Sequence, residues 1–142
     1  DCGIVLMHMQ RDPLTMQFHP EYQNVVSEVM QFLNDRANLL ISNGVDRNRI
    51  ALDPGFGFGK SLEHNLEMLS KFQLFSDSGF PVLAGISRKS MLGKITGKEA
   101  DQRLAPSIAA AIMAADRGAK IIRVHDVPET IDALKLWEAA TS

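Results

Sequence analysis

Residues Arg49 to Ser61 read RIALDPGFGFGKS, a short apolar run that ends in an acid and a glycine-rich loop. The apolar run does not alternate with polar residues, which is typical of a strand in a parallel sheet covered on both faces. The loop is not a nucleotide-binding motif. A P-loop would need a glycine at position 54, where Pro54 stands, and a dinucleotide-binding loop would need one at position 60, where Lys60 stands. The chemistry of this stretch therefore rests on Asp53, which directly precedes the loop.

Three other runs share this strand-like character: Gly3–Met9, Pro81–Ser87 and Lys120–Asp126. Helical periodicity separates and follows the runs. We expect helices over residues 20–43, over 62–78 with Ser61 as the N-cap, over 107–117, and after Asp126, where Glu129 completes a capping-box spacing. Strand and helix thus alternate throughout. The order fits either a small doubly wound sheet or half of a (β/α)₈ barrel, which in complete form takes ~250 residues.

Composition indicates one globular unit without a strongly charged surface. The chain has 142 residues, is 45% hydrophobic and 23% charged, and has a formal net charge of −2. These values speak against general binding to nucleic acid or to a membrane. The single cysteine, Cys2, excludes an internal disulfide framework and favours a reducing, cytoplasmic compartment, and we expect its side chain to be buried. Because a strand pattern begins within the first residues, we expect the sequence to be part of a longer chain.

The residues around Asp53 allow two interpretations of its role. A carboxylate at a strand end can accept two parallel N–H bonds from the edge of an amidine-like ring. Glycines at positions 55, 57 and 59 would then let Phe56 and Phe58 lie close to a flat ligand. Alternatively, Asp53 only orders the turn, as Asp-Pro sequences often do.

A second chemistry-bearing stretch, GISRKSMLG over residues 85–93, leaves the third strand with two cations and two hydroxyls. The hydroxyls of Ser87 and Ser90 and the N–H groups near a helix start would form a nest for an anion. Lys89 can reach a ring carbonyl or nitrogen, whereas we expect Arg88 to be solvated or in a structural ion pair. The alternative is a basic surface loop.

The fourth run places Arg123 and His125 two residues apart, and therefore on the same face of a strand. Because an unpaired buried arginine is costly, this pair suits a phosphate or pyrophosphate. We interpret His64 as a satisfied core residue, and the roles of His8 and His19 stay open. No histidine pair has the spacing of a zinc site, and no serine sits in a nucleophile elbow.

Separated motifs together resemble one family. The stretches LMHMQ (6–10) with P.TMQ (13–17), DPGFGFGK (53–60), GISRKSMLG (85–93) and RVHDV (123–127) resemble, in order and spacing, the dihydropteroate synthases, folate-pathway transferases targeted by sulfonamides. The resemblance implies a (β/α)₈ TIM barrel in which residues 1–142 form a single segment, the C-terminal half with strands five to eight. It also implies that hydroxymethyl-dihydropterin pyrophosphate and para-aminobenzoate are the substrates.

The resemblance further implies roles for individual residues. Asp53 would hold the amino-pyrimidine edge of the pterin, and Lys89 would contact the pterin ring. The residues that would line the pterin pocket are Met7, Phe58 and Gly85. Ser90 and Lys89 would border the para-aminobenzoate site. Arg123 and His125 would hold the pyrophosphate, so Asp53, Lys89, Arg123 and His125 are the predicted catalytic set.

Other implied features lie outside the sequence. The family's magnesium is expected only in the complete enzyme, with its protein ligand outside this chain, and dimerisation is expected through the later helices. Half a barrel leaves two sheet edges unpaired, which favours association. The resemblance also implies that other pterin-binding residues come from the first half of the barrel, so we expect negligible activity from the segment alone. Two alternatives remain, a corrinoid-type methyltransferase that binds a pterin and a non-catalytic half-barrel fragment. The pair Arg123 and His125 argues against the first, because methyl transfer releases no pyrophosphate.

Overall fold

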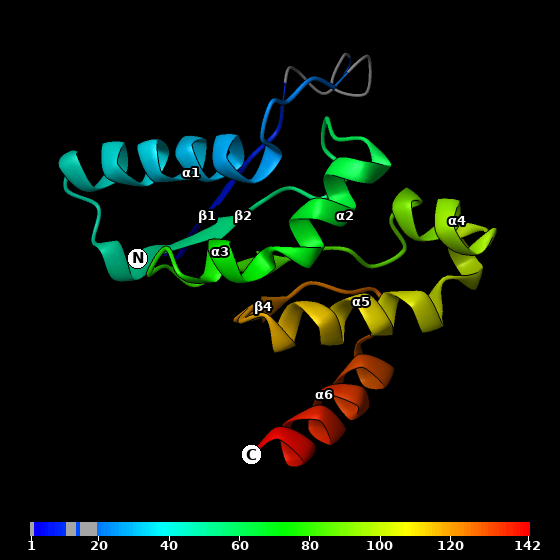
Figure 1. The fold of residues 1–142 in the computed structure, drawn as a ribbon. Coiled ribbons are helices and arrows are strands. Elements are labelled where there is room, and N and C mark those ends of the chain that lie inside the picture. The colour runs from blue at the N-terminus through cyan, green and yellow to red at the C-terminus, as the bar shows by residue number, and fades with distance from the viewer. Residues whose placement is uncertain (1, 11–13, 15–19) are drawn as a thin grey trace.

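The computed structural model of the chain describes residues 2–10, 14 and 20–142. Strand and helix alternate in the order that the sequence predicts (Figure 1). The elements are β1 Ile4–Met7, α1 Val25–Ser42, η1 Arg47–Arg49, β2 Ile50–Asp53, α2 Leu62–Ser70, α3 Phe72–Ser76, β3 Leu83–Ala84, α4 Ser90–Thr96, η2 Ala100–Gln102, α5 Leu104–Asp116, β4 Ile121–Ile122 and α6 Val127–Thr141. None of the helices in the described part of the chain is long and apolar enough to cross a membrane.

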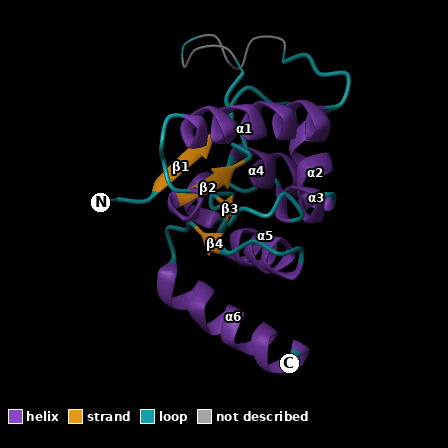
Figure 2. Cartoon of the chain, turned by 90° about the vertical axis from the view of Figure 1, so that its left-hand side faces the viewer, coloured by secondary structure: helices purple, strands orange, loops and turns teal. Residues whose placement is uncertain are grey.

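The strands are parallel and lie in sequential order. β1 pairs with β2, with Met7 opposite Asp53, and β3 pairs with β4. A parallel bridge between Leu52 and Val82 joins the two pairs, so the order is β1-β2-β3-β4 (Figure 2). A doubly wound sheet would reverse direction after its first strands, whereas a barrel adds each strand beside the last. The order therefore selects the barrel from the two architectures that the sequence left open.

One face of the strands carries the hydrophobic core. Ile50 and Leu52 of β2 pack with Val29 and Leu33 of α1 and with the aromatic rings of α3, in a single buried cluster. Each of these side chains is at most 1% exposed, and burying one contributes ~1.5–3 kcal/mol. The helices thus cover the outer face of the strands and fix the direction in which each strand end points.

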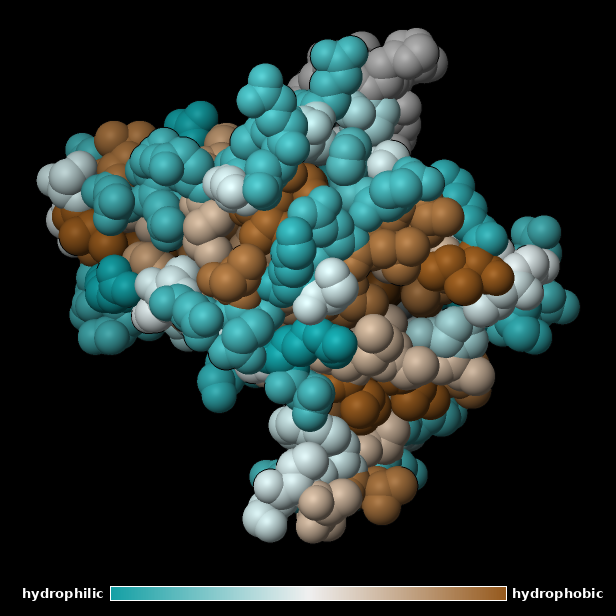
Figure 3. Space-filling view, viewed as in Figure 1, coloured by the Kyte–Doolittle hydropathy of each residue, from teal (hydrophilic) through white to brown (hydrophobic). Residues whose placement is uncertain are grey.

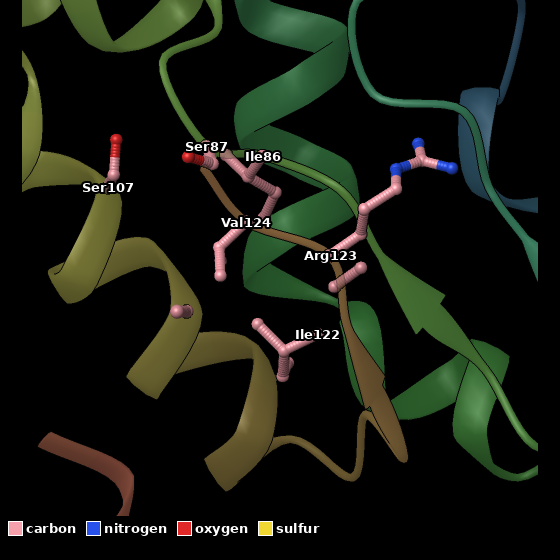
Figure 4. Close-up of a pocket in the computed structure, with 8 residues that line it drawn as sticks. Ile86, Ser87, Ser107, Ile122, Arg123 and Val124 are labelled. Atoms are coloured by element: carbon pink, nitrogen blue, oxygen red, sulfur yellow. The ribbon is translucent and has the colours of Figure 1, made fainter. Parts of the chain in front are cut away.

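Alternate residues point to the opposite, inner face. Figure 4 shows Ile122 and Val124 directed towards α5, while Arg123 between them points to the other side. By the same alternation and the strand register, Met7, Asp53 and Arg123 share the inner face at the carboxyl ends of their strands. Val5 on β1 and Ile121 on β4, each two residues before the site residue of its strand, are 48% and 40% exposed. These three predicted site residues therefore lie at one edge of a partly open inner face.

Several element boundaries differ from the prediction. The first helix begins at Val25 rather than near Pro20, because the Asn24 side chain accepts a hydrogen bond from the Ser27 N–H and caps it there. The helix predicted over 62–78 is two helices, since the chain leaves helical geometry at Lys71. The strand pairing of β3 and β4 covers only two residues each, although the backbone bond from Arg123 N–H to the Ala84 carbonyl extends it.

The capping box predicted at the last helix is wrong. Asp126 does precede α6, but its side chain makes no cap hydrogen bond. Its carboxylate instead binds the Arg88 guanidinium, with Nη2 2.6 Å from Oδ1. The charged partner outcompetes the helix N–H groups because a guanidinium binds a carboxylate at two points. The same contact confirms that Arg88 forms a structural ion pair.

Candidate functional site

The glycine-rich loop after β2 is built around Asp53 and Lys60. The Asp53 carboxylate accepts a hydrogen bond from the Gly55 N–H at 2.8 Å, which starts the turn. Buried Lys60 returns to the beginning of the loop, and its ammonium donates to the carbonyls of Gly55 at 2.7 Å and Phe58 at 2.9 Å. Asn65 accepts from the Gly57 N–H at 2.8 Å. The loop is therefore held by its own side chains around a fixed carboxylate.

Lys60 and Asn65 are site residues that the sequence analysis missed. The backbone of a tight loop leaves carbonyl and N–H groups without helix or strand partners, and such groups need side-chain partners when they are buried. A lysine at the end of the loop, followed by an asparagine in the first helical turn, was a signal for these partners. The sequence analysis compared Lys60 only with nucleotide-binding motifs, which the loop does not match, so this structural use of the lysine was not considered.

An ion pair between Asp53 and Arg123 connects the carboxyl ends of β2 and β4. Arg123 Nη2 lies 3.2 Å from Asp53 Oδ2, although the Asp53 side chain is 1% exposed and that of Arg123 is 53% exposed. The guanidinium crosses directly over Gly85 of the intervening strand, where an added Cβ would stand 2.5 Å from Nη2. A side chain at position 85 would thus displace the Arg123 guanidinium from this place. The half-exposed arginine has one end on a buried anion and one face open to a ligand.

Lys89 and Phe58 meet beside the glycine-rich loop. The ammonium of Lys89 lies 4.2 Å from the centre of the Phe58 ring, within the range of a cation–π contact. The lysine stem also lies close to Gly57, where an added Cβ would be 3.4 Å from Cδ. A cation and an aromatic face are therefore held together beside the glycine-rich loop.

His125 and Ser87 complete a small pocket. The Ser87 hydroxyl lies 2.9 Å from His125 Nδ1 and accepts a hydrogen bond from the His125 N–H at 3.2 Å. The pocket has a volume of about 190 Å³, and its lining consists of Gly85, Ser87, Lys89, Arg123, Val124 and His125. Ser90 is exposed as the first residue of α4 and is not part of this lining. Of the two serines predicted for the anion nest, Ser87 lines this pocket and Ser90 does not.

Burial shifts the protonation of the charged groups. Burial raises the pKa of Asp53, although the Gly55 N–H and the charge of Arg123 oppose that rise. Burial and the charge of Arg123 lower the pKa of Lys89. Burial likewise lowers the pKa of Lys60 to about 7. Titratable groups perturbed in this way gather at functional sites, because their environment is arranged for a ligand rather than for water.

His8 lies beneath this site as a neutral imidazole. It is 6% exposed, its ring packs edge-on against Phe32 at 5.0 Å, and within the described residues its Nδ1 has no hydrogen-bond partner. Burial and the charge of Lys60 lower the pKa of His8 from 6.5 to about 4. Between these values the unfolded chain binds the proton and the folded chain does not. The free energy of unfolding should therefore fall as the pH drops from 6.5 to 4.

We expect the substitution His8→Phe to remove this part of the pH dependence. The variant keeps an aromatic ring against Phe32 but has no group to protonate. The difference in free energy of unfolding between the two proteins should change by up to ~3 kcal/mol across the window. Urea unfolding of both proteins at closely spaced pH values measures this difference in free energy of unfolding. A constant difference across that window would show that His8 is not the group responsible.

Other residues singled out in the sequence have structural positions. His64 is half-buried rather than in the core, and its Nδ1 accepts from the Ser61 N–H, which closes a capping box at α2. Cys2 is exposed, contrary to the expectation of burial, because it precedes the first paired residue of β1. His19 and the motif at 13–17 lie outside the described residues. The described residues contain no group of three or more acidic, histidine or cysteine side chains that could hold a metal ion.

Comparisons with known proteins place the chain in a family. Residues 1–125 match the family described as Pterin binding enzyme. The dihydropteroate synthase of Haemophilus influenzae is 48% identical over 139 residues, which is 98% of this chain and 50% of that protein. The chain therefore spans about half the length of the curated relatives it matches.

Solved structures agree with this match. A Yersinia pestis dihydropteroate synthase in a sulfonamide drug complex superposes with a TM-score of 0.95 at 40% identity, covering 98% of this chain and 51% of that one. A Xanthomonas albilineans dihydropteroate synthase in complex with 7,8-dihydropteroate gives a TM-score of 0.91 at 44% identity, covering 99% and 52%. The observed strands and helices thus correspond to half of a (β/α)₈ barrel. The chain belongs to the pterin-binding enzyme family.

Proposed function

We propose that this chain supplies half of the active site of a dihydropteroate synthase. In the proposed reaction, the amino nitrogen of para-aminobenzoate bonds to the methylene carbon of hydroxymethyl-dihydropterin pyrophosphate. The C–O bond to pyrophosphate breaks, and the amino group loses one proton. The observation that carries the proposal is the ion pair between Asp53 and Arg123, which brings a pterin-type acceptor and an anion-type donor to one inner face. The 7,8-dihydropteroate complex of the Xanthomonas albilineans relative supports the same product.

The pterin would bind at the buried carboxylate. Asp53 accepts from the ring N–H groups of the amino-pyrimidine edge, and burial strengthens that contact because no water competes for the oxygens. The Phe58 ring and the ammonium of Lys89 would lie against the flat ring system. Met7, opposite Asp53 in the strand register, and Gly85 would complete the walls.

The pyrophosphate would bind in the pocket beside this carboxylate. Arg123, His125 and Lys89 all line that pocket, so its donors are positive or can donate a hydrogen bond. Their task is to stabilise the negative charge that develops on the leaving oxygen, which requires fixed donors and no covalent nucleophile. Ser90, at the start of α4, would border the para-aminobenzoate with Lys89.

Magnesium and the compartment are separate expectations. The described residues provide no cluster of metal ligands, so no step is assigned here to the magnesium expected in the complete enzyme. The single cysteine supports the proposal of a cytoplasmic protein.

We also propose a homodimer that forms through the later helices. Figure 3 shows apolar surface over α2 and α4. A groove of about 300 Å³ lies where these helices meet α5, and the side chains that line it include Leu66, Met91, Ile95 and Met113. Apolar surface of this kind marks contact sites between proteins. Light scattering of the chain and of an Ile95→Lys variant tests the proposal, since the variant should be monomeric.

The activity test uses this chain alone and a chimera. In the chimera, the chain replaces the corresponding half of the Haemophilus influenzae relative. We expect the chimera to release pyrophosphate in a sulfonamide-sensitive reaction, and the chain alone to give negligible turnover. A chimera that folds and binds a pterin but does not turn over would favour the methyltransferase. Turnover by the chain alone would contradict the half-site proposal.

In the chimera, we expect Arg123→Met to slow pyrophosphate release by roughly 30-fold, because a hydrogen bond to a charged group is worth about 2 kcal/mol. Methionine keeps the length of the stem while removing the guanidinium. The matched control is Arg117→Met, since Arg117 donates to the Met113 carbonyl at the far end of α5. An equal loss in both variants would mean that general destabilisation, not the anion site, explains the result.

A further inference from the structure

Ser87 has a specific relation to His125 that the chemistry described above does not use. Its side chain is 6% exposed, and it leaves the end of the third strand beside the strand that carries His125 (Figure 4). Two contacts join the residues: the His125 N–H donates to Ser87 Oγ at 3.2 Å, and Oγ lies 2.9 Å from Nδ1 of the ring. The serine thus touches both the backbone and the ring of one histidine.

The hydrogen bond from the His125 N–H to Ser87 Oγ restricts how the same hydroxyl can bond to the His125 ring. A serine hydroxyl has one proton to donate and two lone pairs that can accept. The backbone N–H of His125 takes one lone pair. Within the described residues, the only side chain that faces the Ser87 hydroxyl as an acceptor is the His125 ring. If Nδ1 carried the proton, Oγ would accept twice and its own buried proton would have no partner, which is costly.

We propose that Ser87 is a positioning residue that sets the tautomer of His125, with the hydroxyl proton donated to Nδ1 and the ring proton held on Nε2. Nε2 is the nitrogen that does not face Ser87, and the exposed His125 residue lines the pocket. A neutral histidine in this tautomer presents an N–H donor to an anion, whereas the other tautomer would present a lone pair and repel it. The backbone contact also fixes the distance between strand and ring.

This inference rests on the proposed function only for the identity of the anion. The expected ligand is the pyrophosphate group of the substrate, and inorganic pyrophosphate serves as its probe. The tautomer itself is a property of the ligand-free chain. The two parts can therefore fail separately.

The experiment is ¹⁵N NMR of the four histidine rings in the natural chain at about pH 8. A His125→Gln spectrum assigns the signals. We expect an unprotonated Nδ1 and a protonated Nε2 in His125. A proton on Nδ1, or a mixture of both tautomers, would overturn the inference without any variant of Ser87.

The variant series compares Ser87→Ala with Ser87→Thr and Ser107→Ala. Ser107 is the matched control, because it is a buried serine nearby whose hydroxyl accepts from the Arg88 N–H at 2.9 Å. We expect Ser87→Ala to give mixed tautomers and to weaken pyrophosphate binding by about tenfold, the effect of one misplaced hydrogen bond. Ser87→Thr should keep the single tautomer and the natural affinity for pyrophosphate. Ser107→Ala should change neither the tautomer nor that affinity. An unchanged tautomer in Ser87→Ala contradicts the assignment.

Pyrophosphate binding separates this inference from the proposed function. If the natural chain holds the expected tautomer but calorimetry detects no binding of pyrophosphate in the chain or the chimera, the proposed function fails and the role of Ser87 in the tautomer stands. If pyrophosphate binds but Ser87→Ala binds it equally well, the anion site stands and the positioning role is wrong.

Discussion

Gly55→Ala is expected to destabilise the folded chain by about 3 kcal/mol or more. Gly55 has a φ angle of 74°, in the left-handed region that alanine adopts only at a cost of ~1–2 kcal/mol. An added Cβ would also stand 1.9 Å from the carbonyl oxygen of His8. That oxygen belongs to backbone at the end of β1, so it cannot rotate away as a side chain would.

Gly44→Ala is the matched control for this prediction. Gly44 also has a positive φ, of 90°, but nothing lies within 4 Å of its added Cβ. Its substitution should cost only the conformational penalty, ~1–2 kcal/mol. Urea unfolding of both variants measures the difference, which isolates the contact between the glycine-rich loop and β1. Equal losses would mean that the loop can move away from β1, and the site would then be less rigid than its hydrogen bonds indicate.

The sequence predicted the positions of the strands because each strand ends in a change of chemistry. Apolar runs that close on Asp53 or on Arg123 and His125 locate both the strand and its carboxyl end. Parallel strands bring such ends to one edge, so the pocket of Arg123, His125 and Lys89 could be anticipated without coordinates. Strand order could not be derived from the apolar runs, since neighbours are chosen by packing among residues far apart in the sequence.

The sequence failed to predict contacts in which several partners compete for the same side chain. The spacing of Asp126 and Glu129 fits a capping box, but Arg88, which is distant in sequence, takes the carboxylate. No motif gave Lys60 a role, and only the folded loop shows that its ammonium binds the carbonyls of the same loop. Local patterns describe what a side chain can bind, and tertiary structure decides which partner is present.

In the chimera, Asp53→Asn is expected to weaken the binding of a dihydropterin by at least ~100-fold, measured by calorimetry, and to reduce pyrophosphate release accordingly. Each hydrogen bond from a ring N–H to the carboxylate is worth ~1.5–3 kcal/mol, and a ligand edge makes two. Asparagine keeps one oxygen, and that oxygen can still accept from the Gly55 N–H. The second position becomes an NH₂ group that faces the donors of the ligand, so attraction is replaced by repulsion.

The stability of the same variant distinguishes loss of binding from loss of folding. Burial raises the pKa of Asp53, so the folded state holds its proton more tightly than the unfolded state. The charged form therefore costs stability above the unfolded pKa, and the neutral amide should leave the free energy of unfolding at pH 7 unchanged or higher. Asp46→Asn is the control, since the Asp46 carboxylate makes the same type of turn contact, to the Asn48 N–H at 2.9 Å, outside the site. If Asp53→Asn binds the dihydropterin more weakly but keeps its stability, and Asp46→Asn changes neither quantity, the Asp53 carboxylate is assigned to the ligand. A variant that binds normally would assign it to the turn alone.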